Sequence, residues 1–509
     1  MKTEKKGKWK HVLQSPPLRR CFHNYIALTK NSDMDSSREQ QRTSVYHVVA
    51  VPHPSRSHIN SLMNFCKLLA SQERDILVTF VLTQEWLGLI GSDSKPDSIR
   101  FAAIPNVIPS EHVRVADMDA FLDAVRTKME EPFELLLDQL EQTPSLIVAD
   151  TVLHWTVAVG NRRNIPSASF WPMSASFFSL FQHFRLLSQN EHFPANLLGE
   201  CLLATYDNHF TLLTEKGNER VDYIPGVSPT RLADLPQFVY ESNQKILGLL
   251  LNSLSWVPKA QYMLFPATFH ELETLTIDVL RSELSLPIYT MGPPIPYSKE
   301  NDLPTPVPSD DSYFQWLDSQ PCSSVLYIGM GSFLSFSSAQ IDEIAAGLRN
   351  SGVRFIWAAR GESRRLKEAC GDMGLVVPWC DQLRVLRHSS IGGFLSHCGW
   401  NSVMEGVSAG VIFLTLPILY DQGMNSNQIV EEWKVGWRVR KIEDKIDHLV
   451  TREEIAGLMK KFMDLEDDEG KEMRRRAREL KQLCHDAIAE GGSSHTNIKA
   501  FIRYIFHRA

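Results

Sequence analysis

The stretch WCDQLRVLRHSSIGGFLSHCGWNSVMEGVSAGVIFLTLPILYDQ, residues 379–422, carries the strongest structural signal in the chain. Its apolar run 391–395 predicts a short buried strand, and the polar cluster 397–402, HCGWNS, follows that strand directly. A helical pattern comes next, and a second apolar run, 411–416, predicts another strand. The stretch therefore predicts a strand, a polar loop, a helix and a second strand in succession.

The start of the predicted helix is suited to an anion. Asn401 and Ser402 are both good N-cap residues, so either could begin the helix. Polar groups would then lie at the carboxyl end of a parallel strand, which is where α/β sheets bind their ligands. Free backbone N–H groups and the helix dipole at this point favour a negative group, most simply a phosphate.

Alternating strand and helix patterns on either side of this stretch predict two α/β domains. Apolar runs predict buried strands at 45–51, 76–82, 146–149, 165–170, 325–328 and 353–358. Helical patterns lie between successive runs, from Ile59 in the first half and over 339–348 in the second. Such βαβ units predict parallel, doubly wound sheets, and the proline-rich segment 292–311 is a plausible linker between them.

The composition is that of an ordinary globular protein long enough for two domains. The chain has 509 residues, of which 43% are hydrophobic and 22% charged, and a net charge of −7. This charge gives no general case for nucleic acid or an anionic membrane as a partner. Eight scattered cysteines without a C-x-x-C pair argue against a disulfide framework or a zinc site and fit a reducing, cytoplasmic compartment. No apolar run reaches the roughly 18 to 20 residues of a membrane span.

The first 33 residues differ from the rest because they are basic. They lack the apolar core of a secretory signal. We expect a disordered tail or an over-extended start, with Met34 as a natural first residue. A transit peptide is the alternative.

The 44 residues from 379 to 422 resemble, without a gap, the signature box of the plant small-molecule UDP-glycosyltransferases. The motif HCGWNS, the following Glu405 and the final Asp421 and Gln422 carry the resemblance, which extends less strongly over about residues 44–509. It implies two Rossmann-like domains facing a cleft, the GT-B architecture. It also implies inverting transfer of a sugar, glucose by preference, from a UDP-sugar to a hydroxyl of a small apolar acceptor. A phenolic or flavonoid acceptor of plant secondary metabolism is the first expectation, and no cofactor or metal is implied beyond the UDP-sugar donor.

The resemblance also implies a domain layout. The expected parts are a basic extension over 1–43, an acceptor-binding domain over 44–290 and a linker over 291–311. A UDP-sugar-binding domain is expected over 312–485, and a C-terminal helix over 486–509 that packs back on the first domain. We expect a monomer.

The resemblance assigns each part of the donor to particular residues. Trp379, with the backbone of Cys380, is assigned to uracil, and Gln382 and Glu405 are assigned to the ribose. His397, Asn401 and Ser402, with the backbone of Trp400, are assigned to the phosphates. Asp421 and Gln422 are assigned to the sugar. The residue types suit these roles, because a carboxylate accepts from two hydroxyls and an amide both donates and accepts. Ser57 and Ser332 are further candidates for phosphate contact. Taken singly, the two tryptophans could instead be core residues and the glutamate a solvated helix position.

On the acceptor side, transfer needs a base that takes the hydroxyl proton. His58 follows the first strand and matches the position of the family's catalytic histidine, whereas His53 in the same loop matches a position that is not catalytic. Asp150 ends a buried strand of the same domain and is expected to hold the ring of His58, as the acid does in a Ser-His-Asp triad. The alternative for Asp150 is an N-cap of the following helix.

Several features leave other interpretations open. The pair Asp117 and Asp119 forms a D-x-D motif that binds a metal in another glycosyltransferase architecture, but its polar, helix-forming surroundings favour a solvated helix face. The turn 329–334 is only a partial G-x-G-x-x-G, which makes a dinucleotide oxidoreductase a poor fit. A UDP-sugar-binding protein that no longer catalyses remains the second functional hypothesis.

The chain also departs from the family pattern. Ser55 and Ser57 stand where glycines are common in the catalytic loop, and Leu419 and Tyr420 replace a frequent aromatic-then-small pair. Gln422 favours glucose by analogy with the family.

Overall fold

Two parallel sheets organise the part of the chain that this computed structural model describes: residues 45–73, 75–91, 95–111, 114, 117–193, 217–239, 245–293, 312–331, 336–359, 363–440 and 448–506. These residues belong to one compact unit, Val45–Ala509. The expected basic extension 1–43, most of the expected linker 291–311 and the candidate Ser332 lie outside the described residues.

The first sheet has the strand order β3-β2-β1-β4-β5-β8-β9, with every described pair parallel. Its strands are β1 (Tyr46–Val51), β2 (Ile76–Thr83), β3 (Ile99–Ile104), β4 (Leu146–Asp150), β5 (Ser167–Phe170), β8 (Tyr262–Phe265) and β9 (Ile288–Thr290). All six residues of β1 are buried, as in a sheet covered on both faces. Alternate residues enter two separate cores, Val48 and Ala50 on one face and Val49 and Val51 on the other.

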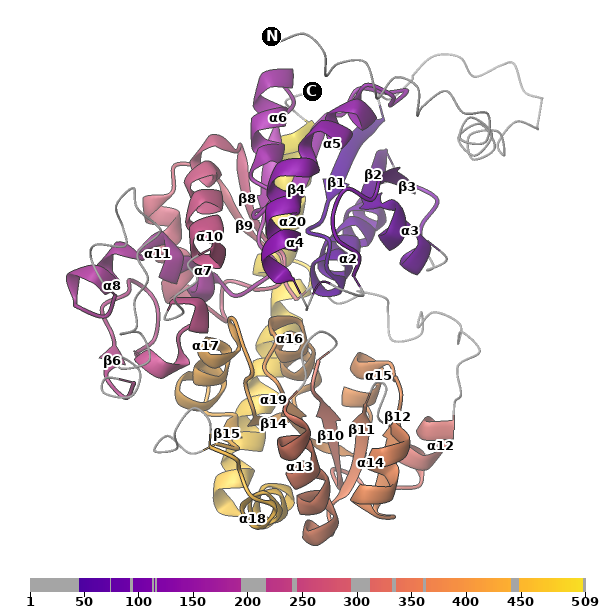
Figure 1. Cartoon of the computed structure of the whole chain (residues 1–509), viewed down its shortest axis with the longest axis vertical. Helices are drawn as coiled ribbons and strands as arrows, with labels where there is room; N and C mark the ends of the chain where they lie inside the picture. The colour runs from indigo at the N-terminus through magenta and orange to yellow at the C-terminus, as the bar shows by residue number, and fades with distance from the viewer. Residues whose placement is uncertain are drawn as a thin grey trace. The chain divides into compact units, whose positions relative to one another are not determined.

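The second sheet has the order β12-β11-β10-β13-β14-β15 and is likewise parallel throughout its described pairs. Its strands are β10 (Val325–Gly329), β11 (Arg354–Ala358), β12 (Gly374–Val377), β13 (Ile391–Ser396), β14 (Ile412–Thr415) and β15 (Gly436–Arg438). The expectation of two Rossmann-like sheets is thereby confirmed (Figure 1). A small antiparallel pair, β6 (Arg220–Val221) and β7 (Thr230–Arg231), lies outside both sheets.

The helices follow the strands in both halves. In the first half they are α2 (Arg56–Gln72), α3 (Gln84–Ile90), α4 (Met118–Lys128), α5 (Glu130–Leu137), α6 (Trp155–Arg163), α7 (Ala175–Gln182), α8 (Arg185–Gln189), α10 (Lys245–Trp256) and α11 (Thr274–Glu283), with the 3₁₀ turns η4 (Leu232–Asp234), η5 (Gln237–Val239) and η6 (Val257–Lys259). In the second half they are α12 (Ser312–Asp318), α13 (Ser338–Ser351), α14 (Ser363–Cys370), α15 (Gln382–Leu386), α16 (Trp400–Ala409), α17 (Gln422–Asn427), the π-helical turn η7 (Gln428–Glu432), α18 (Arg452–Met463), α19 (Asp468–Ile488) and α20 (Ser493–Phe506).

Two helix starts differ from the sequence-based expectation. Helix α2 begins at Arg56 rather than near Ile59, so His58 lies in its first turn and not in the preceding loop. The N-cap of α16 is Gly399, and neither Asn401 nor Ser402 serves as cap. A Cβ atom at Gly399 would lie 2.5 Å from Nε2 of His397, so only a residue without a side chain fits at this turn.

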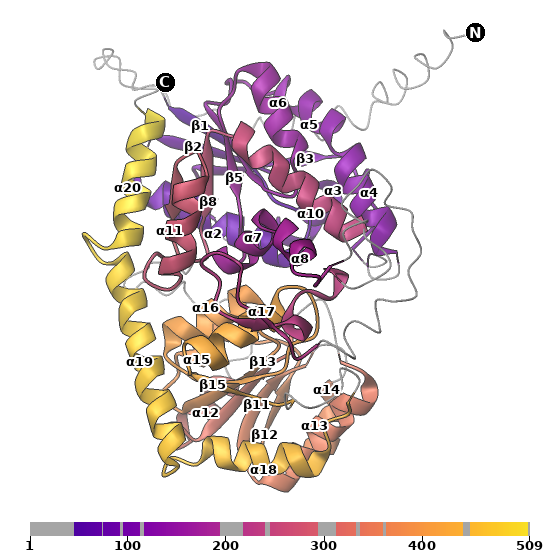
Figure 2. The same ribbon diagram turned by 90° about the vertical axis from the view of Figure 1, so that its left-hand side faces the viewer.

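The last helices connect the two halves, as Figures 1 and 2 show in yellow. Helix α19 contacts α16 and β14, whereas α20 contacts β9 of the first sheet. Four buried apolar side chains of α20 enter the core of the first half: Ile498, Phe501, Ile502 and Ile505. The oxygen of Gly292 accepts a hydrogen bond from Oγ of Ser494 at 2.6 Å. The C-terminal helix therefore completes the first sheet's core.

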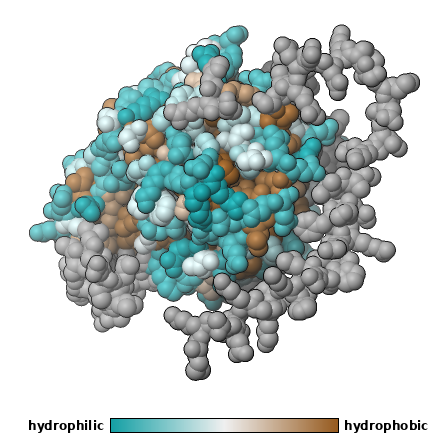
Figure 3. Space-filling model, turned by 90° about the horizontal axis from the view of Figure 1, so that it is seen from above, coloured by the Kyte–Doolittle hydropathy of each residue, from teal (hydrophilic) through white to brown (hydrophobic). Residues whose placement is uncertain are grey.

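Within the described residues, no helix combines the length and the apolar content that crossing a bilayer requires. The face seen in Figure 3 is mostly hydrophilic, with smaller hydrophobic patches between.

Candidate active site

The edge of the first sheet brings His58 and Asp150 together. Strands β1 and β4 are neighbours, with Val51 paired to Ala149, and the chain order reverses between them. Side chains that follow these two strands therefore meet at a topological switch point. Nδ1 of His58 lies 2.5 Å from Oδ2 of Asp150, whose side chain is only 1% exposed. Because an ionised carboxylate only accepts, this contact keeps the proton on Nδ1 and leaves the Nε2 lone pair as the basic site.

Asp150 does not act as a helix N-cap. Its Oδ1 accepts a hydrogen bond from the backbone N–H of Val152 at 3.2 Å, and the next helix, α6, begins only at Trp155. The backbone contact fixes one carboxylate oxygen while the other faces His58. The structure thus favours a positioning carboxylate over the capping alternative.

His53 lies beside His58 but has a different environment. The two ring centroids are 5.1 Å apart, and Nδ1 of His53 lies 3.2 Å from Oγ of Ser55. Burial lowers the pKa of His53 to about 3, and the nearby His58 acts in the same direction. His53 is therefore neutral at physiological pH. Its ring packs edge-to-face against the ring of Phe121.

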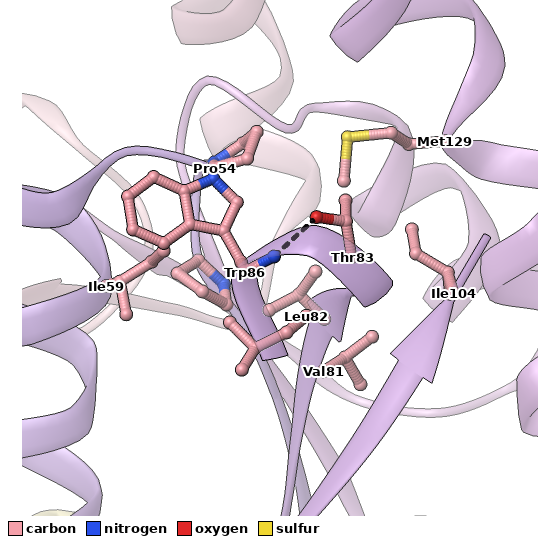
Figure 4. Close-up of a pocket in the computed structure, with 10 residues that line it drawn as sticks. Pro54, Ile59, Val81, Leu82, Thr83, Trp86, Ile104 and Met129 are labelled. Carbon is pink, nitrogen blue, oxygen red and sulfur yellow. Dashed lines mark hydrogen bonds between the residues drawn. The ribbon is translucent and has the colours of Figure 1, made fainter. Parts of the chain in front are cut away.

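An apolar hollow lies behind this loop (Figure 4). Pro54 and Ile59 line it from the loop and from α2, with Trp86 beside them, and Met129 lies across from Trp86. Thr83 supplies its polar atom, which already accepts a hydrogen bond from the backbone N–H of Trp86 at 3.3 Å. The side chains that line the hollow therefore pack against the loop, and none of them is a reactive group.

On the second sheet, three predicted ribose and phosphate residues form one cluster. The amide nitrogen of Gln382 donates to Oγ of Ser402 at 2.8 Å and to Oε2 of Glu405 at 2.6 Å. Its amide oxygen accepts from the hydroxyl of Tyr327 at 2.9 Å. Burial raises the pKa of Glu405 to about 7, although the hydrogen bond from Gln382 acts in the opposite direction. The cluster is a set of polar groups that hold one another in place beside the start of α16.

His397 occupies the equivalent switch point of the second sheet, between β10 and β13. Its Nδ1 lies 3.3 Å from the oxygen of Gly329. Burial lowers its pKa to about 4, so the ring is neutral at physiological pH. A Cβ atom at Gly331 or Gly399 would lie 2.8 or 2.5 Å from Nε2, so two glycines confine the ring from both sides. Because the carbonyl of Gly329 only accepts, the single N–H of the neutral ring lies on Nδ1, and Nε2 can donate to an anion at the helix start only when the ring takes up a second proton.

Trp400 and Asn401 link the second half to the first. The indole N–H of Trp400 donates to the oxygen of Ala267 at 2.8 Å, and the side chain is 3% exposed. The amide of Asn401 donates to the oxygen of Ser57 at 3.2 Å, directly before His58. Trp400 was expected to contribute through its backbone, but its side chain has a role of its own, because it joins the two halves next to the site.

The carboxylate of Asp421, near the end of the stretch 379–422, is held by a residue of α17. Its Oδ2 accepts from the amide of Asn425 at 2.8 Å, and Asn425 also donates to the oxygen of Cys398 at 2.9 Å. Burial raises the pKa of Asp421 to about 6, while the bond from Asn425 and the charge of the nearby His58 lower it. The carboxyl group of Asp421 is thus buried and held by Asn425 of the helix that it precedes.

The remaining candidates have varied surroundings. Trp379 is 55% exposed, which leaves its indole accessible for stacking. The thiol of Cys380 is buried and lies 3.7 Å from the hydroxyl of Tyr327. The amide oxygen of Gln422 accepts from the backbone N–H groups of Ile418 and Leu419 at 2.8 and 3.1 Å. These two hydrogen bonds hold together the loop 418–422.

The D-x-D motif belongs to the structure of α4. Asp117 caps the helix by accepting from the N–H of Ala120 at 3.0 Å, and Asp119 pairs with Lys245 at 2.9 Å. Among the described residues, no group of three or more His, Cys, Asp or Glu side chains is arranged to hold a metal ion.

The sequence analysis missed three supporting residues. Tyr327 and Asn425 fix Gln382 and Asp421, and Gln237 contacts the loop before Asp421 from the other half. Asn425 lies four residues after Asp421, a spacing that places both on one helix face and could have indicated the pair. The other two contacts join distant segments and have no local signal.

Comparison with known proteins agrees with this geometry. The family model described as UDP-glucoronosyl and UDP-glucosyl transferase matches residues 299–447. UDP-glycosyltransferase 87A1 of Arabidopsis thaliana is 48% identical over 461 residues, which are 89% of this chain and 99% of the relative.

Two solved structures extend the comparison. A UDP-glucose:anthocyanidin 3-O-glucosyltransferase in complex with UDP has a TM-score of 0.76 and 26% identity, covering 91% of this chain and 99% of its own. The UGT2 of Phytolacca americana, complexed with UDP-2fluoro-glucose and pterostilbene, has a TM-score of 0.72 and 25% identity, covering 90% and 99%.

The two Rossmann-like sheets, with a His–Asp pair on one and a polar cluster on the other, define a glycosyltransferase of the GT-B architecture. The chain belongs to the plant UDP-glycosyltransferases. It is therefore an enzyme that transfers a sugar from a UDP-sugar to an acceptor.

Proposed function

We propose that this enzyme transfers glucose from UDP-glucose to a hydroxyl of a small apolar acceptor, such as a phenolic or a flavonoid, with inversion at the sugar carbon. The 2.5 Å contact between His58 and Asp150, one residue after the Ser57 oxygen that Asn401 of the second half contacts, is the observation that carries the proposal. This contact sets the proposed base of the first half beside the start of α16 in the second half.

In this mechanism His58 is the general base. Asp150 holds the proton of Nδ1 and stabilises the charged ring that forms when Nε2 takes the acceptor's proton. The acceptor oxygen attacks the anomeric carbon as the bond to UDP breaks, and the departing oxygen of UDP keeps the bonding pair. Attack from the side opposite UDP inverts the configuration, through a transition state with oxocarbenium character.

The donor is held by the second half. Trp379 stacks on uracil beside the backbone of Cys380, and Glu405 with Gln382 binds the ribose. His397, the N-terminal turn of α16 and the hydroxyls of Ser402, Ser57 and Ser332 meet the phosphates, where they stabilise the charge of the leaving group. This arrangement replaces a metal ion, so we propose metal-independent transfer.

Asp421 and Gln422 bind the hydroxyls of the sugar. The carboxylate of Asp421 accepts from two hydroxyls, and the amide nitrogen of Gln422 donates because its oxygen is engaged in the loop. Glucose is proposed because Gln422 favours it by analogy with the family that the sequence resembles.

The names of the structural relatives support the acceptor class. One is named for anthocyanidin, and another was solved with pterostilbene, and both of these are phenols. An intact His–Asp pair argues against the alternative of a UDP-sugar-binding protein without activity.

We further propose that the enzyme acts as a monomer in the cytoplasm. The six described cysteines, at 66, 322, 370, 380, 398 and 484, are free thiols, which is typical of a reducing compartment. Gel filtration and a fluorescent fusion would test the two statements.

The test is a panel of phenols, flavonoids and terpenoid alcohols incubated with UDP-glucose, with UDP release and product mass as readouts. We expect a hexose to be added to a phenolic hydroxyl, a β-glucoside by NMR, and no loss of rate in EDTA. An α-linked product would contradict inversion. UDP binding without transfer to any member of the panel would favour the inactive alternative.

A further inference from the structure

The two proposed sugar-binding residues follow a backbone position that is unusual for a side-chain-bearing residue. Tyr420, directly before Asp421, has a φ of +62°, in the left-handed region that few residues other than glycine adopt. Such a conformation persists only when the surrounding contacts impose it. The contacts around 418–423 therefore decide where Asp421 and Gln422 point.

One of these contacts comes from the acceptor half. The backbone N–H of Tyr420 donates to the amide oxygen of Gln237 at 2.8 Å, although the two residues are 183 positions apart. The ring of Phe238, the next residue, lies 6.2 Å from the ring of Tyr420. The turn η5 thus contacts both the backbone and the side chain of Tyr420, the residue that precedes Asp421.

A second contact holds the other side of the pair. A Cβ atom at Gly423 would lie 2.4 Å from the oxygen of Asp234, so the backbone of α17 runs directly against η4. The carboxylate of Asp234 is buried between two guanidinium groups: Arg231 of the same half donates at 2.7 and 2.9 Å, and Arg438 of the donor half at 3.1 and 3.3 Å. This double pairing fixes η4 against the second sheet.

From these contacts we propose that the segment 231–239 of the acceptor half positions Asp421 and Gln422 for the donor sugar, with Gln237 and Asp234 as its positioning residues. The inference rests on the proposed role of Asp421 and Gln422 in binding the sugar. Its consequence is that the hexose subsite, unlike the uracil subsite, is assembled by both halves.

The test compares affinities for UDP-glucose and for UDP, which lacks the hexose, in the full-length enzyme without acceptor. Gln237→Met removes the accepting oxygen at nearly constant volume. We expect UDP-glucose to bind about tenfold more weakly, the effect of one lost buried hydrogen bond, and UDP to bind as in the wild type. The KM for UDP-glucose should rise in parallel.

A matched control removes another hydrogen bond between the halves. Oγ of Ser228 donates to Oε2 of Glu432 at 2.8 Å, away from the loop 418–422. Ser228→Ala should leave both affinities unchanged. If Gln237→Met also left the UDP-glucose affinity unchanged, or weakened UDP equally, the positioning role would be wrong.

Asp421→Asn separates this inference from the proposed function. If Asp421 binds the sugar, this variant loses much of the preference for UDP-glucose over UDP. An unchanged preference would refute the sugar-binding role of Asp421, and the inference would fall with it. A lost preference in Asp421→Asn together with an unaffected Gln237→Met would refute the inference alone.

Discussion

At the scale of single residues, the protonation of the buried acid Glu405 is set by its surroundings. Glu405 faces the amide of Gln382 at 2.6 Å, yet burial dominates and raises its pKa to about 7. The folded protein therefore holds this proton more tightly than the unfolded chain does. The contribution of Glu405 to stability is fully present below pH 4.5 and is lost as the pH rises through about 7.

Glu405→Gln should consequently flatten the dependence of the melting temperature on pH. Between pH 5 and pH 8 the wild type should lose up to about 3 kcal/mol more unfolding free energy than the variant, because Gln does not titrate. Thermal melts of both proteins across this range provide the measurement. Parallel curves would show that the carboxyl group is not buried as described.

Residue positions were predictable where a local motif carried them. His58, Asp150 and the box residues could be named because each lies at the end of a strand or at a characteristic spacing. Tyr327 and Gln237 could not be named, since their contacts join segments distant in the sequence, whereas the spacing of Asn425 from Asp421 was a local signal that went unused.

At the scale of elements, strand positions were predicted more accurately than helix starts. Apolar runs mark strands directly, and β1, β10 and β13 lie within a residue of the predicted runs. The start of α16 was wrong because two good capping residues, Asn401 and Ser402, outweighed Gly399 in the prediction. The space taken by the ring of His397 decides that turn, and this space is visible only in three dimensions.

Gly399→Ala tests this explanation. The new methyl group would meet Nε2 of His397, a ring that also lies close to Gly331, so we expect a stability loss of about 1 to 3 kcal/mol and weaker UDP binding. Gly457→Ala is the matched control, because no heavy atom lies within 4 Å of its Cβ position in α18. It should keep UDP affinity and gain up to about 1 kcal/mol of helix stability. Equal behaviour of the two variants in titration and melting would refute the steric account.

At the scale of the whole molecule, the C-terminal helix joins the core of the half that carries His58. Phe501 is fully buried and its ring centroid lies 5.4 Å from Tyr289 and 6.3 Å from Phe65 of α2, the helix whose first turn carries His58. The alternation of strands and helices predicted two sheets, whereas the expectation that the C-terminal helix packs back on the first domain came from the family resemblance, because such packing is long-range.

Phe501→Ala should therefore destabilise the protein by about 3 to 5 kcal/mol, the usual effect of removing a buried aromatic ring. Lys499→Ala, at an exposed position of the same helix, should change stability by less than about 0.5 kcal/mol. Thermal melts would compare them. A Phe501→Ala protein as stable as the Lys499→Ala protein would mean that α20 is not part of the first core.

The central claim is that an imidazole of the first half removes the acceptor's proton while the second half holds the UDP-sugar. The most direct measurement compares turnover and UDP affinity in His58→Ala, with Asn60→Ala at an exposed position of the same helix as control. The account predicts a turnover at least about a hundredfold lower in His58→Ala, with UDP affinity unchanged, and a normal Asn60→Ala enzyme. Transfer at the wild-type rate by His58→Ala would contradict it.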